Sequence, residues 1–461
     1  MAATTERMLH TDAFSWYMES DPRLRSTVVA VALLDAAVDM DYLRERVDRM
    51  TRLVPHFRAR VEPAPWRSGP PRWVIDSDFD LDYHLRRVHL PEPAGWSGVL
   101  EQARIAAMAD FDRDRPLWEA TVLEGLPEGK GALITKTHHA LSDGIGGLEV
   151  IGLVVDSSRE LPLLEMPAAP RPDDGGSAAH LMATVHDRVG GAIAAGQAIG
   201  GALWKAPMAA AHPLGSARRL LRESASVGRV VRPILHQASP LMTHRSNIRE
   251  LATMDVSLDE LHRAAARGNG HVNDAFLAGM LGGLHRYHRE HGIDVGDLRV
   301  TMPLSVRRPG DSIGGNRITL LRFALPADLQ EVPARIAAIA RITQAWRHEP
   351  AIAHTQAIAF GLNLMPRSYI QGVLRRVDFL ASDVPGLPEP VYLAGAKVLA
   401  YYPFGPTIGS ALNATLMSYA GTANIGLNVD VGAIPDPPVL LEHLGRGFEE
   451  VVAAGARTSP R

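Results

Sequence analysis

The stretch LITKTHHALSDG, residues 133–144, runs from an apolar segment through two adjacent histidines into an Asp-Gly pair. Its apolar and β-branched first half predicts a strand that ends at His138 and His139. Asp143 or the serine before it can cap a following helix, which we expect to extend to about residue 155. A neutral imidazole takes up a proton near pH 7, so His139 at the end of this strand is a candidate general base.

A histidine that ends a buried strand can also be held by backbone groups alone. The glycines at 144, 146 and 147 bring the backbone close to the site, which favours a catalytic role for His139. For Asp143, capping a helix or pairing with an arginine is as good an interpretation as proton transfer. Adjacent histidines on a strand point to opposite faces, so His138, His139 and Asp143 are a poor metal site and none is predicted.

The composition narrows the class of protein. At 461 residues the chain exceeds one ordinary core, so we expect two domains. A net charge of −3 gives no overall field for nucleic acid, and no nucleic-acid partner is expected. The absence of cysteine excludes disulfides, thiolate metal sites and cysteine nucleophiles. The first residues lack a signal-peptide pattern, and no uncharged apolar run reaches the ~20 residues of a spanning helix, so we expect a cytoplasmic protein.

The pattern of elements predicts three parts. Residues 1–156 form a first α/β domain, 157–247 a flexible loop with a helical crossover, and 248–461 a second α/β domain. The expected strands are 27–34, 121–124, 298–302, 391–393 and 424–429, and the expected helices are 40–53, 98–110, 273–290, 331–347 and 437–454.

The segment 188–249 is rich in alanine and glycine and carries nine basic residues but one acid, Glu223. One interpretation is a helical crossover that packs against both domains. The other is adhesion to anionic lipid, in which each cation near the surface contributes about 1 kcal/mol. The second interpretation predicts a peripheral position on the inner membrane face or on lipid inclusions. Arg218, Arg219 and Arg222 would then be among the contacts.

Two further groups of residues are candidates. Asn273 stands at the start of a predicted helix, where it can be an N-cap or can donate a hydrogen bond to an oxyanion, an interaction worth ~3 kcal/mol in acyl transfer. His285, His288 and His291 recur at helical spacing among charged residues, which predicts a solvated helix end rather than a metal site. No GxSxG nucleophile motif, P-loop or HExxH motif occurs in the sequence.

Together these landmarks resemble the bacterial wax ester synthase/diacylglycerol acyltransferase family, within the CoA-dependent acyltransferases that carry an HHxxxDG motif. The resemblance rests on the order of short elements at residues 12–19, 116–118, 138–144, 273–274, 303–307, 315–316 and 382–386. Two departures stand out. Asp383 replaces the usual asparagine, and residues 25–29 replace a PMHVG-like stretch before the first strand, which bears on how that strand lines the acyl tunnel.

The resemblance implies an α/β (α+β) fold of two chloramphenicol-acetyltransferase-like domains with mixed sheets, joined by the long helical crossover. An active-site tunnel lies at their interface, with His139 reachable from both ends. It also implies transfer of a fatty acyl group from acyl-CoA, as cosubstrate, to a long-chain alcohol or diacylglycerol. No other cofactor is expected.

The residue roles carried by the resemblance are as follows. His139 is the base and Asn273 the oxyanion donor. Arg307 pairs with Asp143 to set the loop, and Glu19 supports the imidazole or the acceptor end. His138 serves the shape of the site, with Gly144 beside it. Two rival functions stay open: a condensation-type acyltransferase that uses a carrier-bound donor, and a non-catalytic lipid-binding protein that uses residues 188–249.

Overall fold

The computed structural model describes residues 6–64, 70–93, 95–172, 226, 238–307, 315–363, 365–374 and 376–456. Most of the predicted crossover, including Arg218, Arg219 and Arg222, lies outside the described residues. The helical crossover and its contact with lipid therefore stay predictions.

The first sheet is mixed and six-stranded, in the order β12-β13-β2-β7-β6-β5. Neighbouring strands are antiparallel except for β5 and β6, which are parallel. Its strands are β2 (Thr27–Leu34), β5 (Leu85–His89), β6 (Trp118–Glu124), β7 (Gly131–His138), β12 (Tyr392–Leu393) and β13 (Ala396–Phe404).

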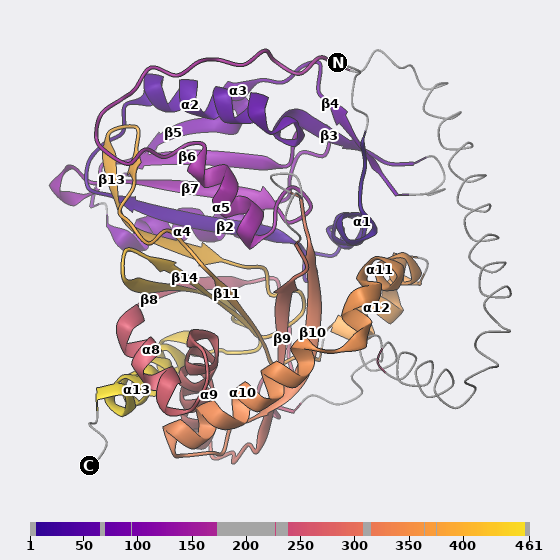
Figure 1. The fold of residues 1–461 in the computed structure, drawn as a ribbon, viewed down its shortest axis with the longest axis vertical. Coiled ribbons are helices and arrows are strands. Elements are labelled where there is room, and N and C mark those ends of the chain that lie inside the picture. Colours follow the sequence, from indigo (N-terminus) through magenta and orange to yellow (C-terminus); the bar gives the residue numbers. More distant parts are fainter. Residues whose placement is uncertain are drawn as a thin grey trace, which may run out of the picture.

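Strands β12 and β13 come from the C-terminal half of the chain but complete the first sheet. In the register, Tyr402 pairs with Val31 and Phe404 with Val29. Figure 1 shows β13 beside β2, far from β2 in sequence. The second sheet begins with a strand at Arg249, and this hairpin returns to the first sheet from the later part of the chain.

The alternation of side chains along β2 divides the first domain into two cores. Val29 and Val31 pack on one face, with α4 (Trp96–Met108). Ala32 and Leu34 pack on the other face, with α2 (Met40–Leu53). This is the period of two that a strand with both faces buried must satisfy.

The second sheet has the order β10-β9-β11-β14-β15-β8, with β11 parallel to both of its neighbours. Its strands are β8 (Arg249–Ser257), β9 (Asp297–Ser305), β10 (Ile318–Pro326), β11 (Phe379–Val384), β14 (Leu412–Tyr419) and β15 (Thr422–Asp430). A single large core joins it to α8 (Leu258–Arg267), α9 (Val272–Glu290), α10 (Val332–Arg347) and α13 (Pro437–Ala456), which lie below it in Figure 1.

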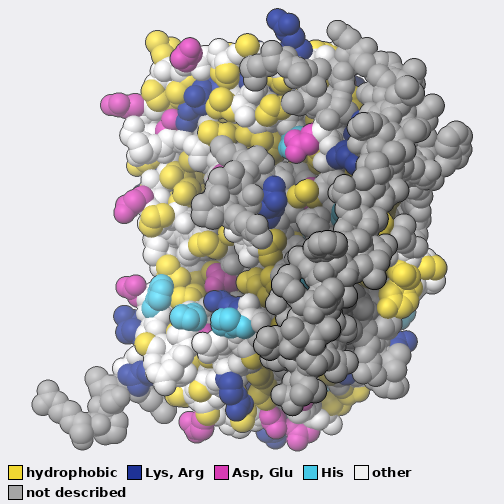
Figure 2. Space-filling view, turned by 45° about the vertical axis from the view of Figure 1, so that its right-hand side comes forward, with side chains coloured by type: hydrophobic (Ala, Val, Ile, Leu, Met, Phe, Trp, Pro, Cys, Tyr) yellow, Lys and Arg dark blue, Asp and Glu magenta, His cyan; other side chains and the backbone are white. Residues whose placement is uncertain are grey.

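Smaller elements complete the described chain. They are β1 (Glu6–Arg7), β3 (Ala59–Glu62) and β4 (Arg72–Ile75), which form a third sheet, and the helical pieces α1 (His10–Met18), η1 (Pro55–Arg58), α3 (Leu81–His84), η3 (Pro127–Gly129), α5 (Gly144–Gly152), η4 (Pro350–His354), α11 (Thr355–Asn363) and α12 (Arg367–Leu374). None of the described helices is both long and apolar enough to cross a membrane. On the face shown in Figure 2, basic and acidic side chains are interspersed over the described part.

The predicted mixed α/β fold with two sheets is confirmed, and the predicted strand 27–34 and helix 40–53 have the observed bounds. The prediction of a solvated helix end is confirmed for His291, which is exposed, but is wrong for the other two histidines. His288 is fully buried, with Nε2 2.7 Å from the Ser239 hydroxyl and Nδ1 2.7 Å from the Leu284 carbonyl oxygen. His285 is also buried, because α9 packs against α8, α10 and α13.

Candidate active site

The last residues of β7 are fixed by neighbouring chain segments. Thr27 of β2 is the register partner of His138. The His138 N–H donates to the Leu117 carbonyl (3.0 Å), and the His139 N–H donates to the Ser26 carbonyl (2.9 Å). The strand therefore ends at a defined place, and its alternation sends the two imidazoles to opposite faces.

His138 is packed inside the first domain. Its Nδ1 accepts a hydrogen bond from the Ala140 N–H (3.0 Å), so in the neutral ring the proton sits on Nε2. Nε2 lies 3.2 Å from Glu19 Oε2. The rings of Trp16 and Phe111 meet His138 edge-on, with centroids 6.1 and 6.0 Å away. His138 is thus held in place and has no exposed surface with which to contact a substrate.

Glu19 follows α1 and supports His138 rather than His139. Burial alone would raise the pKa of its carboxyl, but the net shift is downward because His138, the Ser26 N–H and the Thr27 hydroxyl stabilise the anion. The two donors lie 2.8 and 3.2 Å from the carboxylate oxygens. The carboxylate therefore fixes the end of α1, the start of β2 and the His138 ring together.

His139 lines a cavity instead. Its ring contributes to the cavity wall, and its Nδ1 is buried. Burial lowers the pKa of His139, and the neighbouring His138 lowers it further, while the Asp143 carboxylate opposes the shift. The imidazole is therefore neutral at pH 7 and able to accept a proton.

The cavity encloses about 300 Å³ and extends from the core of the first domain to the second sheet. One arm lies between the first sheet and helices α2 and α5. Most of its lining is apolar. Lining residues from the first domain include Val28, Ala30, Leu43, Met50, Trp118, Leu133 and Thr137, and those from the second sheet include Ser305, Leu320, Leu380, Ser382, Thr415 and Met417.

Asp143 shapes the loop that follows His139. It is the N-cap of α5, and its Oδ1 accepts from the Gly146 N–H (2.7 Å), as the capping prediction requires. Its Oδ2 accepts from the main-chain N–H of Arg317 (2.8 Å). The Arg307 Nε lies 3.1 and 3.2 Å from the two carboxylate oxygens, so the predicted pair of these residues is present. The buried carboxylate is fully engaged by these donors.

These bonds also join the two domains. The Asp143 N–H donates to the Gly315 carbonyl (3.1 Å), and the Gly315 N–H donates to the Leu141 carbonyl (2.7 Å). Arg307 Nη2 donates to the same Gly315 carbonyl (2.8 Å). In the sequence Gly315 is only one landmark of the resemblance, because its pairing with the loop is set by tertiary contacts.

Gly144 stands where the loop meets the second sheet. A Cβ atom at this position would lie 2.8 Å from Cγ2 of Val384. A Cβ at Gly146 would lie 2.3 Å from Nη2 of Arg307. Both glycines are therefore needed for close packing of the loop against the second domain.

Asn273 is not among the residues that line the His139 cavity. It lies in the first turn of α9, is 4% exposed, and neither of its side-chain polar atoms has a partner among the described residues. Its neighbour Asp274 caps this helix end: the His271 N–H (2.8 Å) and the Thr343 hydroxyl (2.9 Å) donate to its carboxylate. The structure therefore brings His139, Asp143, Gly144 and Arg307 together, whereas Asn273 is not part of the cavity lining.

Two residues of the 382–386 landmark were not predicted as site residues. Ser382 brings a hydroxyl to the cavity wall from β11. Asp383 also borders the cavity, and burial raises its pKa to about 6, against the charges of Arg347 and His262. Within the described ranges, no group of three or more His, Cys, Asp or Glu side chains is arranged to hold a metal ion.

Comparison with known proteins identifies the family. The model of the wax ester synthase/diacylglycerol acyltransferase catalytic domain matches residues 8–276, and that of the WS/DGAT C-terminal domain matches residues 314–451. The chain belongs to the wax ester synthase/diacylglycerol acyltransferase family. It is therefore an acyltransferase, and the predicted family and enzyme class are confirmed.

Relatives of this acyltransferase include a putative diacylglycerol O-acyltransferase of Mycobacterium tuberculosis H37Rv, 35% identical over 449 residues, which cover 96% of this chain and 91% of the relative. Another from the same strain is 29% identical over 481 residues, covering 99% of both chains.

Solved structures show the same fold. The Marinobacter aquaeolei VT8 wax ester synthase/diacylglycerol acyltransferase superposes with a TM-score of 0.65 at 21% identity, over 98% of this chain and all (100%) of the other. The first condensation domain of the calcium-dependent antibiotic synthetase gives a TM-score of 0.67 at 15% identity, over 99% of this chain and 98% of the other.

Proposed function

We propose that this acyltransferase moves a fatty acyl group from acyl-CoA to the hydroxyl of a long-chain alcohol or a diacylglycerol. The proposal rests mainly on the position of His139. Its neutral imidazole lines a mostly apolar cavity whose wall includes residues of both sheets. An apolar cavity suits alkyl chains, and a neutral imidazole suits the activation of a hydroxyl. The proposal agrees with the names of the Mycobacterium tuberculosis relative, a putative diacylglycerol O-acyltransferase, and of the Marinobacter wax ester synthase/diacylglycerol acyltransferase.

In this mechanism His139 Nε2 removes the hydroxyl proton while the alcohol oxygen attacks the thioester carbonyl carbon. The tetrahedral intermediate then collapses with cleavage of the C–S bond. The CoA thiolate leaves and takes the proton back from the imidazolium, so the products are an ester and free CoA. The mechanism needs no acyl-enzyme intermediate, no metal and no further cofactor.

The remaining site residues act through position. Asp143 and Arg307 hold the loop that carries the imidazole, and Glu19 with His138 fixes the end of β7. The oxyanion needs a donor, for which we keep Asn273 and add the Ser382 hydroxyl, because Ser382 lies on the cavity wall. Exclusion of water from an apolar cavity would favour attack by the alcohol over hydrolysis.

The natural site of action is proposed to be a lipid surface, either the inner membrane face or a lipid inclusion. The support is the water-insoluble acceptor and the basic composition of residues 188–249. Vesicle sedimentation tests this part separately: binding to anionic vesicles should weaken as salt is raised. Binding that salt leaves unchanged would contradict electrostatic adhesion.

The decisive experiment supplies radiolabelled acyl-CoA with hexadecanol, diolein or an amine, and separates the lipid products by chromatography. We expect labelled wax ester or triacylglycerol and stoichiometric release of thiol, both abolished by His139→Ala. An amide product with no ester would support the condensation-type alternative. Vesicle binding, with no thiol released from acyl-CoA in the presence of any acceptor, would support a non-catalytic lipid-binding protein.

A further inference from the structure

The link between β13 and β14, residues 405–411, crosses from the first sheet to the second and forms part of the cavity wall. Gly405, Pro406 and Ile408 from this link line the cavity. The backbone of Ile408 has φ = +44°, in the left-handed region, and Gly409 follows with φ = +82°. A β-branched residue rarely adopts this conformation, since its side chain crowds the backbone.

Such a conformation persists only where the surroundings enforce it, and it is common where a protein positions a ligand. Here the turn is held at several points. The Ser410 N–H and hydroxyl both donate to the Thr407 carbonyl (2.9 and 2.6 Å). The Asn413 amide donates to the Pro406 carbonyl (2.8 Å), and the Asn428 amide donates to the Gly405 carbonyl (3.0 Å).

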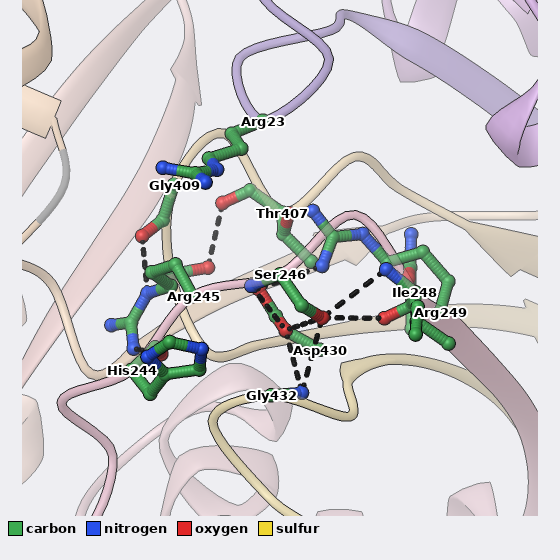
Figure 3. Close-up of polar contacts among 12 residues, drawn as sticks. Arg23, His244, Arg245, Ser246, Ile248, Arg249, Thr407, Gly409, Asp430 and Gly432 are labelled. Atoms are coloured by element: carbon green, nitrogen blue, oxygen red, sulfur yellow. Dashed lines mark hydrogen bonds and ion pairs between the residues drawn. The ribbon is translucent and has the colours of Figure 1, made fainter.

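Arg245 anchors the turn to the second domain. Its Nε donates to the Gly409 carbonyl (2.7 Å), as Figure 3 shows. The rest of the buried guanidinium donates to the carbonyl oxygens of Met242, His244 and Val377, at 2.5, 2.7 and 3.0 Å. The four bonds tie the segment that carries Arg245 to two distant segments, at Val377 and Gly409, and so resist movement of the turn.

The side chain of Ile408 therefore occupies a fixed position. On one side it borders the cavity. On the other it packs against the small core of Met18, Leu24, Ile370 and Leu374, which joins α1 to α12. Ile408 thus separates the cavity from this core, at the part of the wall that both domains share.

We propose that Ile408 is a specificity-determining residue, whose enforced left-handed turn presses its side chain against an alkyl chain in the cavity and limits the chain that fits. The proposal rests on the proposed acyl transfer. The alkyl chain can belong to the acyl-CoA or to the acceptor, and the contact with Ile408 is the same in either case. One methylene group in an apolar pocket changes kcat/KM by about tenfold or more, so such a wall is sufficient to select among chains.

The test measures kcat/KM for a series of acyl-CoA lengths with one acceptor, and for a series of alcohol lengths with one donor. Ile408→Ala keeps the strained backbone conformation but removes most of the side chain that borders the cavity. Ile408→Gly removes both the side chain and the strain. We expect both variants to change the ratio of long-chain to medium-chain kcat/KM by about tenfold in favour of long chains, in one of the two series. Which series responds identifies the chain that contacts Ile408.

Two controls separate this role from a general loss of structure. Ala420→Gly relieves a positive φ of 46° in the turn between β14 and β15, at a residue that is not itself part of the cavity lining. Ile370→Ala removes packing from the same small core without touching the cavity. Both should keep the parental chain-length ratio. If the parent is active and the Ile408 variants keep its ratio in both series, the role of Ile408 is refuted, whereas a parent inactive on every pair would refute the proposed function.

Discussion

The Arg307 guanidinium and the Asp143 carboxylate form a buried ion pair that joins the loop after His139 to the end of β9 in the second domain, with Nε 3.1 and 3.2 Å from the two oxygens. The same carboxylate caps α5, so one side chain links the start of a helix in the first domain to a strand end in the other. The position of the proposed base thus depends on contact between the domains. Five predictions follow from this geometry and from the groups around it.

Removal of either partner should destabilise the protein. In Asp143→Ala the Arg307 guanidinium loses the carboxylate to which its Nε donates, although Glu149 stays 3.8 Å away. In Arg307→Ala the buried Asp143 carboxylate keeps its main-chain donors, the N–H groups of Gly146 and Arg317. We expect each change to lower the free energy of unfolding by about 3 kcal/mol, with the double variant losing less than the sum. Urea unfolding measures this. As a control, Arg446→Ala breaks the exposed pair with Glu442 and should cost at most about 1 kcal/mol. A stable but inactive Asp143→Ala would contradict the structural role.

The pH dependence should follow His139. Its lowered pKa keeps the imidazole neutral at pH 7, so kcat/KM should be level near neutrality and fall on acidification, with a midpoint below 6.5. Because the Asp143 carboxylate opposes the lowering, Asp143→Asn should move this midpoint to still lower pH. Initial rates measured between pH 5 and 8 test both points. A midpoint at or above 6.5 would argue against His139 as the titrating base.

The two candidate oxyanion donors can be separated by kinetics. The structure places Ser382 on the cavity wall and Asn273 outside its lining. We therefore expect Ser382→Ala to reduce kcat by roughly a hundredfold with little change in KM. Asn273→Ala should change the free energy of unfolding more than it changes kcat, because the buried amide of Asn273 lies at the start of α9. A hundredfold loss of kcat in Asn273→Ala, with unchanged stability, would restore the role that the sequence suggested.

Glu19 should act through His138. Glu19→Gln removes the charge that faces Nε2 and should lower the free energy of unfolding by about 1–3 kcal/mol. The pKa of Glu19 is lowered in the folded protein, so its stabilising contribution is complete above the unfolded value near 4.5 and is lost as the pH falls through the folded pKa. Thermal unfolding from pH 3 to 7 should accordingly show a flatter acid decline in the variant. An identical decline in both proteins would argue against this contribution.

The contribution of Asp383 to stability should depend on pH in the opposite direction to that of Glu19. Its pKa is raised to about 6, so the folded state binds the proton more tightly than the unfolded state does. Its contribution to stability is therefore complete below pH ~4 and declines as the pH rises to about 6. Asp383→Asn, which restores the amide usual in the family, should raise the melting temperature at pH 7.5 but much less at pH 4. An equal change at both values would mean that titration of Asp383 is not the cause.

The register of β11 explains why Asp383 titrates in this way. Asp383 alternates with Phe379 and Ala381, which belong to the core beneath α8, α9 and α10. Ser382 and Leu380 lie on the other face of the strand, and the cavity lining includes these two residues as well as Asp383. The sequence showed the departure from the family at this position, but the face could be assigned only after the strand was paired.

Sequence alone determined the local chemistry of the site. The strand, turn and helix around His139, the opposite faces of the paired histidines and the Asp143 cap depend on side-chain period and on hydrogen bonds between residues close in the chain. These local requirements are met whatever the rest of the protein packs against the segment. The pair of Asp143 with Arg307 came from the resemblance, and the structure shows its geometry.

The tertiary structure decided which distant segments share a surface. It placed β13 in the first sheet, buried His288, kept Asn273 out of the cavity lining and held Ile408 at a positive φ. Each of these outcomes depends on contacts between residues far apart in sequence, whose energies exceed local conformational preferences. Local patterns constrain how a segment folds, but only long-range packing determines what it faces.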